Sequence, residues 1–267
     1  TGTTAMNFEF SEEQNQLREQ ARGFLDDKCN TKVVRNILDT DTPYDQNLWR
    51  QIVDMGWTAA AMPEEYDGLG LSYLELSVIA EELGRAYAPV PFSSSVYLAT
   101  EAILAAGSKA QKESWLPKLA SGAAIGCFAL SEDAGQPSAE SMTATVNKGL
   151  LTGTKLPVAD GDIADFAIVV AKESESVSAY LVDLGASGVT RETVTTIDPT
   201  RSHARLDFSD TPVELLGEAG EGWNLVQNVY NRAAILFSWE QVGGAEAALE
   251  MAKEYALGRF AFGRPIA

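Results

Sequence analysis

The feature that most constrains the fold is a helical pattern of about 40 residues near the C-terminal end of the chain, far above the globular mean. Apolar residues recur there every three or four positions and form one stripe along a helix. The stripe consists of Val242, Ala245, Leu249, Ala252 and Ala256. We expect this helix to begin near Gly222 and to run on to Phe262. A helix of that length must pack against other long helices.

Two differently patterned regions precede this helix. Residues 7 to about 120 show helical spacing, opened by Ser11 and Gln14, which fit a capping box. Further helices are expected at 46–55, 74–83, 94–106 and 109–120. Residues 125 to about 216 are rich in Val, Thr and Ile that alternate with turn residues, which is typical of short strands. Strands are expected at 142–146, 167–170 and 178–182.

These patterns predict an α+β fold in three parts. Residues 6–122 are expected to form an all-α domain and residues 123–217 a β-barrel or sandwich domain. Residues 218–267 are expected to form the first long helix of a C-terminal helical bundle. We interpret residues 1–5 as a cloning remnant and Met6 as the natural start.

Composition narrows the function classes. The net charge of −18 over 267 residues argues against binding to nucleic acid or to an anionic membrane surface. No apolar run approaches the roughly 18 to 20 residues that span a bilayer, and residues 1–6 lack a signal-peptide pattern, so we expect a cytoplasmic protein. Cys29 and Cys127 match no metal spacing and are expected to be free thiols. The single histidine, His203, is expected on the surface, and no metal site is predicted.

The order of the three parts and four short segments resembles the acyl-CoA dehydrogenases. The segments are Pro-Glu-Glu-Tyr-Asp-Gly-Leu-Gly at 63–70, Ile-Ala-Glu-Glu-Leu-Gly at 79–84, Gly243-Gly244, and 255–265 with its Arg-x-x-Phe-Gly-Arg-Pro ending. The resemblance implies an FAD enzyme that removes hydrogens from the α and β carbons of an acyl-CoA thioester. It also implies a tetramer with central helical bundles, and a chain that continues through several more helices beyond Ala267.

By this resemblance, Arg259 reaches the pyrophosphate of an FAD bound mainly by a neighbouring subunit, with Phe262 and Gly263 beside it. A guanidinium suits this role because it binds two phosphate oxygens in a fixed fork. The alternative is a solvated basic helix end. Ser131 keeps a hydroxyl that can reach the flavin ring. The rest of that loop departs from the family pattern.

Two segments carry this departure. Residues 131–138 read Ser-Glu-Asp-Ala-Gly-Gln-Pro-Ser, without the family's Gly-Ser pair. Pro157 and Ala159 replace a ring-stacking Trp and a flavin-contacting Thr. We therefore expect that this chain does not hold a complete FAD alone.

The catalytic base is also unassigned. The family position for a glutamate in the long helix falls on Ala233, and the other family position lies beyond residue 267. Glu240 is a weak candidate because seven residues displace it by about 10 Å along a helix, and it is otherwise a structural or interface acid. Arg232, next to Ala233, is expected to form an ion pair at an interface. Arg201 resembles a common family residue without a derivable role.

Three functions remain open. The first is a subunit with a degenerate site in an α2β2 acyl-CoA dehydrogenase, completing the FAD site of a homologous subunit, with a steroid side-chain CoA among the candidate substrates. The second is an ordinary homotetrameric dehydrogenase with a divergent flavin site. The third is a non-enzymatic member that binds an acyl-CoA or a protein.

Overall fold

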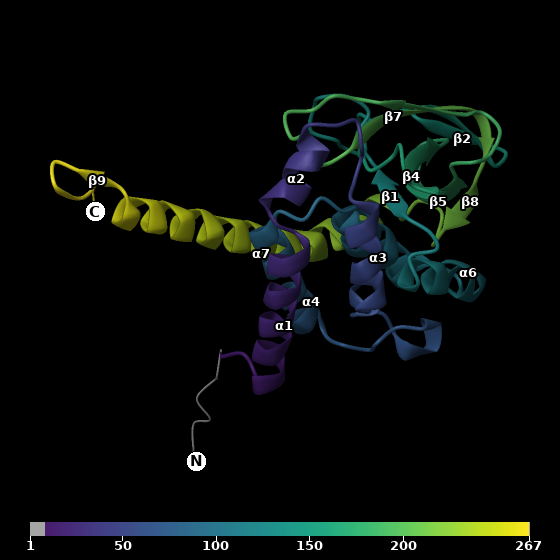
Figure 1. Ribbon diagram of the computed structural model, residues 1–267. Coiled ribbons are helices and arrows are strands. Elements are labelled where there is room, and N and C mark those ends of the chain that lie inside the picture. The colour runs from purple at the N-terminus through teal and green to yellow at the C-terminus, as the bar shows by residue number, and fades with distance from the viewer. Residues whose placement is uncertain (1–8, 267) are drawn as a thin grey trace, which may run out of the picture.

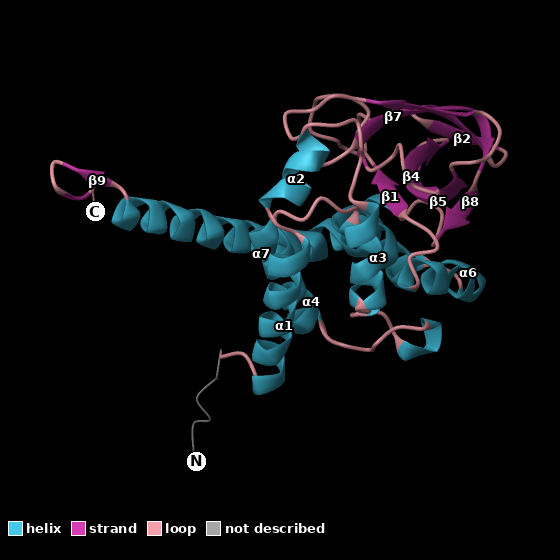
Figure 2. Ribbon diagram, in the orientation of Figure 1, coloured by secondary structure: helices cyan, strands magenta, loops and turns pink. Residues whose placement is uncertain are grey.

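The computed structural model describes residues 9–266. Helices come first, a sheet follows, and one long helix closes the chain (Figures 1 and 2). The first helices are α1 (Glu12–Lys28), α2 (Thr31–Leu38), α3 (Gln46–Asp54), α4 (Tyr73–Ala86), the π-helix η3 (Ser93–Thr100), α5 (Glu101–Ala106) and α6 (Lys109–Ala120), with single turns η1 (Trp57–Ala59) and η2 (Glu64–Tyr66). The predicted succession of a helical region, a strand region and a long helix is confirmed.

Local capping explains where these helices begin. The predicted capping box of Ser11 and Gln14 opens α1, and Ser72 and Ser108 open α4 and α6 in the same way. Each serine hydroxyl accepts a hydrogen bond from a backbone N–H that has no partner within the helix. The helix expected at 94–106 is divided, because its first part is the π-helix η3 and only its second part is α5.

The middle region is a mixed sheet whose strands run in the order β6-β7-β3-β2-β4-β5-β8, with β1 paired in parallel with β4. The strands are β1 (Gly126–Ala129), β2 (Thr145–Asn147), β3 (Leu150–Ala159), β4 (Phe166–Glu173), β5 (Ser176–Asp183), β6 (Val189–Thr193), β7 (His203–Pro212) and β8 (Glu214–Leu216). The strands predicted at 167–170 and 178–182 lie within β4 and β5. The strand predicted at 142–146 is largely wrong, because the N–H groups of Thr143 and Ala144 donate to the Glu132 carboxylate.

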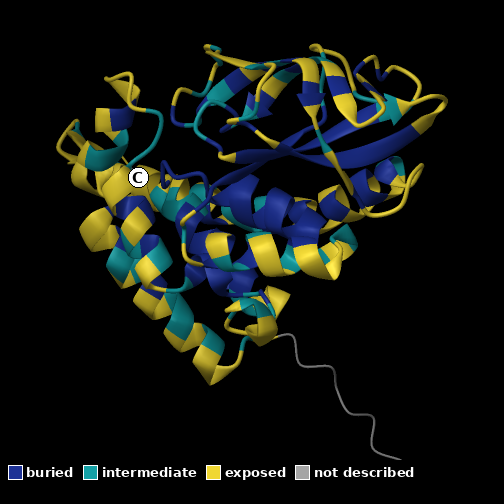
Figure 3. Ribbon diagram, turned by 90° about the vertical axis from the view of Figure 1, so that its right-hand side faces the viewer, coloured by how far each residue is buried: buried dark blue, intermediate teal, exposed yellow. Residues whose placement is uncertain are grey.

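The core lies where the sheet faces the helices. Figure 3 shows the buried residues gathered between these layers, and the central strand β4 is buried along nearly its whole length. Helices α4 and α7 (Gly222–Gly258) cross at very short range. A Cβ on Gly84 would lie 2.1 Å from the Glu240 carbonyl oxygen, and one on Gly243 would lie 1.9 Å from that of Glu81. Only glycine permits this crossing.

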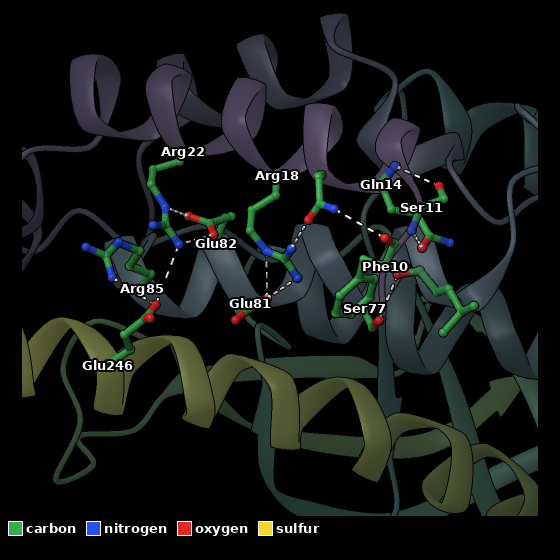
Figure 4. Close-up of polar contacts among 12 residues, drawn as sticks. Phe10, Ser11, Gln14, Arg18, Arg22, Ser77, Glu81, Glu82, Arg85 and Glu246 are labelled. Carbon is green, nitrogen blue, oxygen red and sulfur yellow. Dashed lines mark hydrogen bonds and ion pairs between the residues drawn. The ribbon is translucent and has the colours of Figure 1, made fainter. Parts of the chain in front are cut away.

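Charged pairs connect α1, α4 and α7 (Figure 4). Arg18 of α1 pairs with Glu81 of α4 at 3.0 Å, and Arg22 pairs with Glu82 at 2.8 Å. Glu82 is the most buried member, with only 1% of its side chain exposed. On the other side of α4, Arg85 pairs with Glu246 of α7. The three helices are therefore joined by ion pairs as well as by apolar packing.

The prediction that the last helix reaches Phe262 is wrong. Helix α7 ends at Gly258, and the chain then forms a small hairpin of β9 (Phe260–Ala261) and β10 (Arg264–Pro265). The turn residues Phe262 and Gly263 have φ angles of 54° and 79°, the left-handed pair that a tight two-residue hairpin requires. The Ile266 N–H closes the hairpin on the Arg259 carbonyl at 2.9 Å.

The outer half of α7 projects away from the rest of the chain and carries the hairpin at its tip (Figure 1). Its apolar residues have no cover within the described chain: Leu249 is 69% exposed and Tyr255 is 64% exposed. The expected stripe is therefore present, and its packing partner is not supplied by residues 9–266. None of the helices in the described range combines the length and apolar character that a membrane span needs.

Candidate functional site

A cavity of about 550 Å³ lies between the sheet domain and α7. Its walls come from the end of β3, the segment 198–202 with the first residue of β7, the start of η3 and the middle of α7. This volume is in the range of small-molecule sites. The apolar residues of its lining include Leu83, Ala88, Leu98 and Phe237. The polar residues, called the polar wall below, include Ser94, Asp160, Arg201, His203 and Glu240.

Glu240 is the central polar group of this cavity. Its Oε1 accepts a hydrogen bond from the Tyr97 hydroxyl at 2.8 Å, and its Oε2 lies 3.7 Å from Nη2 of Arg201. Burial raises the pKa of Glu240, although the charge of Arg201 and the Tyr97 hydrogen bond oppose the shift. Burial next to Glu240 also raises the pKa of Tyr97 well above its ordinary value, so Tyr97 remains a donor.

A second carboxyl group, Asp160, faces the same cavity. It is 2% exposed, and Oδ2 accepts from the Ser94 hydroxyl at 2.5 Å. Burial raises the pKa of Asp160, while the Arg201 charge and the Ser94 hydrogen bond act against the rise. His203 was expected on the surface, but it is only half-exposed and lines the cavity. Its Nδ1 lies 3.1 Å from the Arg201 carbonyl oxygen.

Arg201, for which the sequence predicted no role, forms hydrogen bonds that connect separate segments of the polar wall. Its Nη1 donates to the Val90 carbonyl at 3.0 Å and to the Ser93 hydroxyl at 2.9 Å. These bonds connect the segment before β7 to the start of η3. The only sequence signal for this polar wall is the Ser93-Ser94-Ser95 run inside an otherwise apolar segment.

Ala233, at the expected base position, is 1% exposed and carries no proton-transfer group. Its neighbour Arg232 was expected to form an ion pair at an interface. It pairs instead within the chain, with Glu101 at 2.6 Å, beside the Tyr73 hydroxyl. Glu240 therefore lines the cavity of about 550 Å³, whereas Ala233 and Arg232 do not. Its assignment as a base stays a prediction.

The loop that contains Ser131 is anchored by a buried ion pair. Lys155, with 0% of its side chain exposed, contacts Glu132 at 2.7 Å. Burial lowers the pKa of Lys155 to about 8, and the Glu132 contact only partly offsets this. Burial pushes the pKa of Glu132 upward, but hydrogen bonds from Lys155 and Thr143 outweigh it and hold that pKa below its ordinary value.

This loop offers few groups that fit FAD. The Ser131 carbonyl already accepts from the Leu156 N–H at 2.8 Å. Pro157 has no N–H to donate, and Ala159 has no hydroxyl. Of the polar side chains expected there, the Ser131 hydroxyl is the one that remains for a flavin. That the chain does not hold a complete FAD alone stays a prediction.

The other predicted cofactor residues lie far from Ser131. Tyr230 of α7 contacts Phe128 of β1 with ring centroids 5.8 Å apart, and Ser131 follows Phe128 closely in sequence. From Tyr230 the helix continues to Gly258, a rise of about 40 Å, before Arg259 begins the hairpin. Phe262 is fully exposed at its turn. One chain thus does not bring Arg259 and Phe262 to Ser131.

Known proteins with similar sequences and structures indicate the family of this chain. The family model for the acyl-CoA dehydrogenase N-terminal domain matches residues 11–123. Acyl-CoA dehydrogenase IpdE2 of Mycobacterium tuberculosis is 33% identical over 256 residues, covering 96% of this chain and 67% of that protein. One chain of the ChsE4-ChsE5 complex of Mycobacterium tuberculosis aligns with this chain with a TM-score of 0.86 and 27% sequence identity. The alignment covers 98% of this chain and 71% of the matched chain.

A variant of the Tcur3481-Tcur3483 steroid ACAD has a TM-score of 0.84 and 28% identity to this chain. The match covers 96% of this chain and 69% of the other. The similarity thus extends across the helical region, the sheet and α7.

Proposed function

The chain belongs to the acyl-CoA dehydrogenase family, and on this basis we propose that it is one subunit of a heteromeric acyl-CoA dehydrogenase, of α2β2 composition. In this proposal its own flavin site is degenerate, and its hairpin completes the FAD site of a homologous partner subunit. The reaction is the α,β-dehydrogenation of an acyl-CoA thioester, with FAD supplying the hydride acceptor.

The observation that carries this proposal is the separation of Arg259 from Ser131. The hairpin lies at the far end of a helix that projects from the rest of residues 9–266 (Figure 1), and in this proposal it contacts a different chain. Arg259, Phe262 and Gly263 are all exposed, so their side chains and backbone are available to a partner. The chemistry of a guanidinium suits the pyrophosphate of FAD.

The apolar residues of outer α7 need a cover that residues 9–266 do not supply. Leu249, Met251 and Tyr255 are each more than half exposed and lie along the helix that leads to the hairpin. A homologous helical bundle would bury them and bring Arg259 to its own flavin. Fully burying one such side chain contributes about 1.5–3 kcal/mol, so a few of them stabilise an interface substantially.

The proposal assigns the catalytic base to the partner subunit. Ala233 stands at the family position on this helix and cannot transfer a proton, and the other family position lies beyond residue 267. Glu240 is placed instead at the polar wall of the cavity. For the acyl group we propose a steroid side chain. This rests on the similarity to a solved structure described as a steroid ACAD.

The test is flavin stoichiometry. The chain is produced alone and together with a homologous acyl-CoA dehydrogenase subunit encoded beside it, and the FAD content is measured from the visible spectrum. The proposal expects one FAD per two chains, present only after co-expression. One FAD per chain in the isolated protein would show that the chain has a complete site and would refute the proposal.

Arg259→Ala tests the role of the hairpin in that complex. Loss of a charge-assisted contact worth about 1.5–3 kcal/mol should weaken FAD retention roughly 10- to 150-fold. Lys253→Ala removes another exposed positive charge, from α7, and should leave retention unchanged. Equal FAD affinity in both variants would exclude Arg259 from the cofactor site.

A further inference from the structure

A second groove lies where the end of α1, the start of α2 and the end of α4 meet the outer half of α7. Its volume is about 560 Å³, and it shares only Tyr87 with the cavity described above. Its apolar residues include Leu25, Cys29, Val34, Ala86 and Tyr87. Its charged residues are Arg22, Asp26, Glu82, Arg85, Glu250 and Glu254. We call it the acidic groove because its carboxylates outnumber its arginines.

The two arginines of the acidic groove are already paired with glutamates (Figure 4). Arg22 contacts the buried Glu82 at 2.8 Å. Arg85 contacts Glu246 at 3.2 Å and also pairs with Glu250. The hydrogen bond from Arg85 lowers the pKa of Glu250, so Glu250 is ionised at neutral pH. The arginines thus leave no positive charge for the remaining carboxylates of the groove.

Those remaining carboxylates belong to Asp26 and Glu254. Both residues are exposed, and among residues 9–266 neither side chain has an ion-pair or hydrogen-bond partner. They come from two different helices, α1 and α7. The excess negative charge therefore borders the acidic groove from two elements of the fold.

Between these charges the acidic groove has an apolar floor. Leu25 is 1% exposed and Cys29 is 5% exposed, whereas Tyr87 is 56% exposed. Tyr87 directly follows α4 with a φ of 54°, a left-handed position at which glycine is usual. The local backbone thus gives no reason for a tyrosine, and its side chain adds exposed apolar surface to the groove.

An apolar floor bordered by unpaired carboxylates suits an amphipathic helix with basic residues beside its apolar stripe. An anionic ligand would be repelled. An uncharged apolar helix would cover Asp26 and Glu254 without pairing them, which is costly. Glu250 and Glu254 are one helical turn apart, about 6 Å along α7. Lys or Arg residues four positions apart on a facing helix have the same spacing.

We propose that the acidic groove binds a basic amphipathic helix of another protein chain. The apolar residues of that helix cover Leu25 and Tyr87, and its basic residues pair with Asp26 and Glu254. This is the helix-in-groove mode of recognition.

The proposed docking is independent of the proposed role in an FAD site. Glu250 and Glu254 are each two positions from Ala252 of the apolar stripe, which places them about 160° around α7 from it. The docking therefore uses a different face of α7 and needs neither flavin nor the hairpin. Its failure is distinguishable from a failure of the flavin stoichiometry test.

The experiment uses the full chain and three synthetic peptides of equal length. The first is an amphipathic helix of Leu and Lys, the second has Glu in place of every Lys, and the third is a scrambled Leu-Lys sequence without an apolar stripe. Dissociation constants are measured by fluorescence anisotropy. We expect the amphipathic Leu-Lys peptide to bind at least about tenfold more tightly than the scrambled one, because only it buries its apolar residues together, and the Glu peptide not to bind. Equal binding of the two lysine peptides would indicate attraction to the net charge of −18 alone and would overturn the inference, as would no binding.

A double variant locates the binding to the acidic groove. Asp26→Asn with Glu254→Gln keeps the side-chain shapes and should weaken the amphipathic Leu-Lys peptide about tenfold, since two ion pairs are lost. The control, Asp41→Asn with Glu218→Gln, removes the same charge at exposed positions outside the groove and should leave the affinity unchanged. Equal affinities of the two double variants would remove the acidic groove from the binding site.

Tyr87→Gly tests the apolar part of the site. Glycine adopts the left-handed conformation without strain, so the chain should keep its fold, while the peptide affinity should fall about tenfold. An unchanged affinity would contradict the role of Tyr87. If a second copy of the chain covers the groove instead, light scattering would show a dimer that Asp26→Asn with Glu254→Gln dissociates, and that result would also overturn the inference.

Discussion

Replacing Gly243 by alanine should destabilise the chain at the crossing of α4 and α7. The new Cβ would lie 1.9 Å from the Glu81 carbonyl oxygen and 3.0 Å from the Arg85 backbone nitrogen. Both are backbone atoms, so no flexible side chain can move aside. The two helices must separate by more than 1 Å to restore a contact of about 3.3 Å, and overpacking of this kind typically costs about 1–3 kcal/mol.

A neighbouring glycine offers a matched control. A Cβ on Gly244 meets the Gly84 carbonyl oxygen at 3.4 Å, an acceptable contact. Both substitutions gain up to about 1 kcal/mol of helix propensity, so only steric overlap separates them. We expect Gly244→Ala to be neutral or slightly stabilised and Gly243→Ala to be about 2 kcal/mol less stable than Gly244→Ala.

The free energy of unfolding is measured by urea denaturation, followed by far-ultraviolet circular dichroism. A helical signal suits this measurement because α4 and α7 together contribute a large part of the helix. If Gly243→Ala is as stable as Gly244→Ala, the close crossing of the two helices is wrong.

Two further predictions concern buried charges. Arg22→Met leaves the Glu82 carboxylate, 1% exposed, without its partner. We expect the free energy of unfolding, measured by urea denaturation, to fall by about 2 kcal/mol, less than for a fully buried pair because Arg22 itself is 34% exposed. The control Arg35→Met, on the surface of α2, should change stability by less than about 0.5 kcal/mol. Equal effects of the two substitutions would contradict the role of the pair. Lys155 has its pKa lowered to about 8 by burial, so the folded chain binds fewer protons than the unfolded chain between about pH 8 and 10.5. The free energy of unfolding should therefore rise with pH across that interval by up to about 3 kcal/mol. Lys155→Met should lose this rise. Identical pH profiles of variant and wild type would show that Lys155 titrates normally.

The features predicted correctly from the sequence depend on local physical chemistry. The capping box of Ser11 and Gln14 acts over three residues, through the Ser11 hydroxyl and the Gln14 Oε1. The Gln14 contact with distant Glu75 uses Nε2 instead and does not compete with the box. The stripe on α7 is set by the helical period alone. Both are therefore readable without knowledge of the tertiary fold.

Two predictions failed, the strand at 142–146 and the end of the last helix at Phe262. The first failed because of a tertiary contact, and the second because of the backbone conformation. The sequence pattern predicts a strand at Thr143. The Thr143 backbone N–H instead donates to the carboxylate of Glu132, a residue outside that pattern. The pattern at 259–262 continues the spacing of α7, but a left-handed turn at Phe262 and Gly263 folds the segment back. Spacing of apolar residues does not report backbone φ angles.

The cavity was beyond sequence reasoning because its polar groups are brought together by the fold. Asp160 follows β3, Arg201 precedes β7 and Glu240 lies in α7, so more than 30 positions separate each from the next. The comparison of the segment at 155–160 with the family pattern drew attention to what Pro157 and Ala159 lack. It gave no indication that the adjoining Asp160 would be buried beside Ser94.

The crossing of α4 and α7 links the two sites that this chain presents. Gly84 contacts the backbone of Glu240 itself, so the register that allows the crossing also fixes where the Glu240 carboxyl group enters the cavity. The same rigid helix continues from Glu240 to Gly258, a rise of about 27 Å, and carries the hairpin. A shift of α7 at Gly84 would therefore displace both the cavity acid and Arg259. The proposed contribution to a partner's FAD and the position of the cavity acid thus share one structural requirement, the absence of side chains at Gly84 and Gly243.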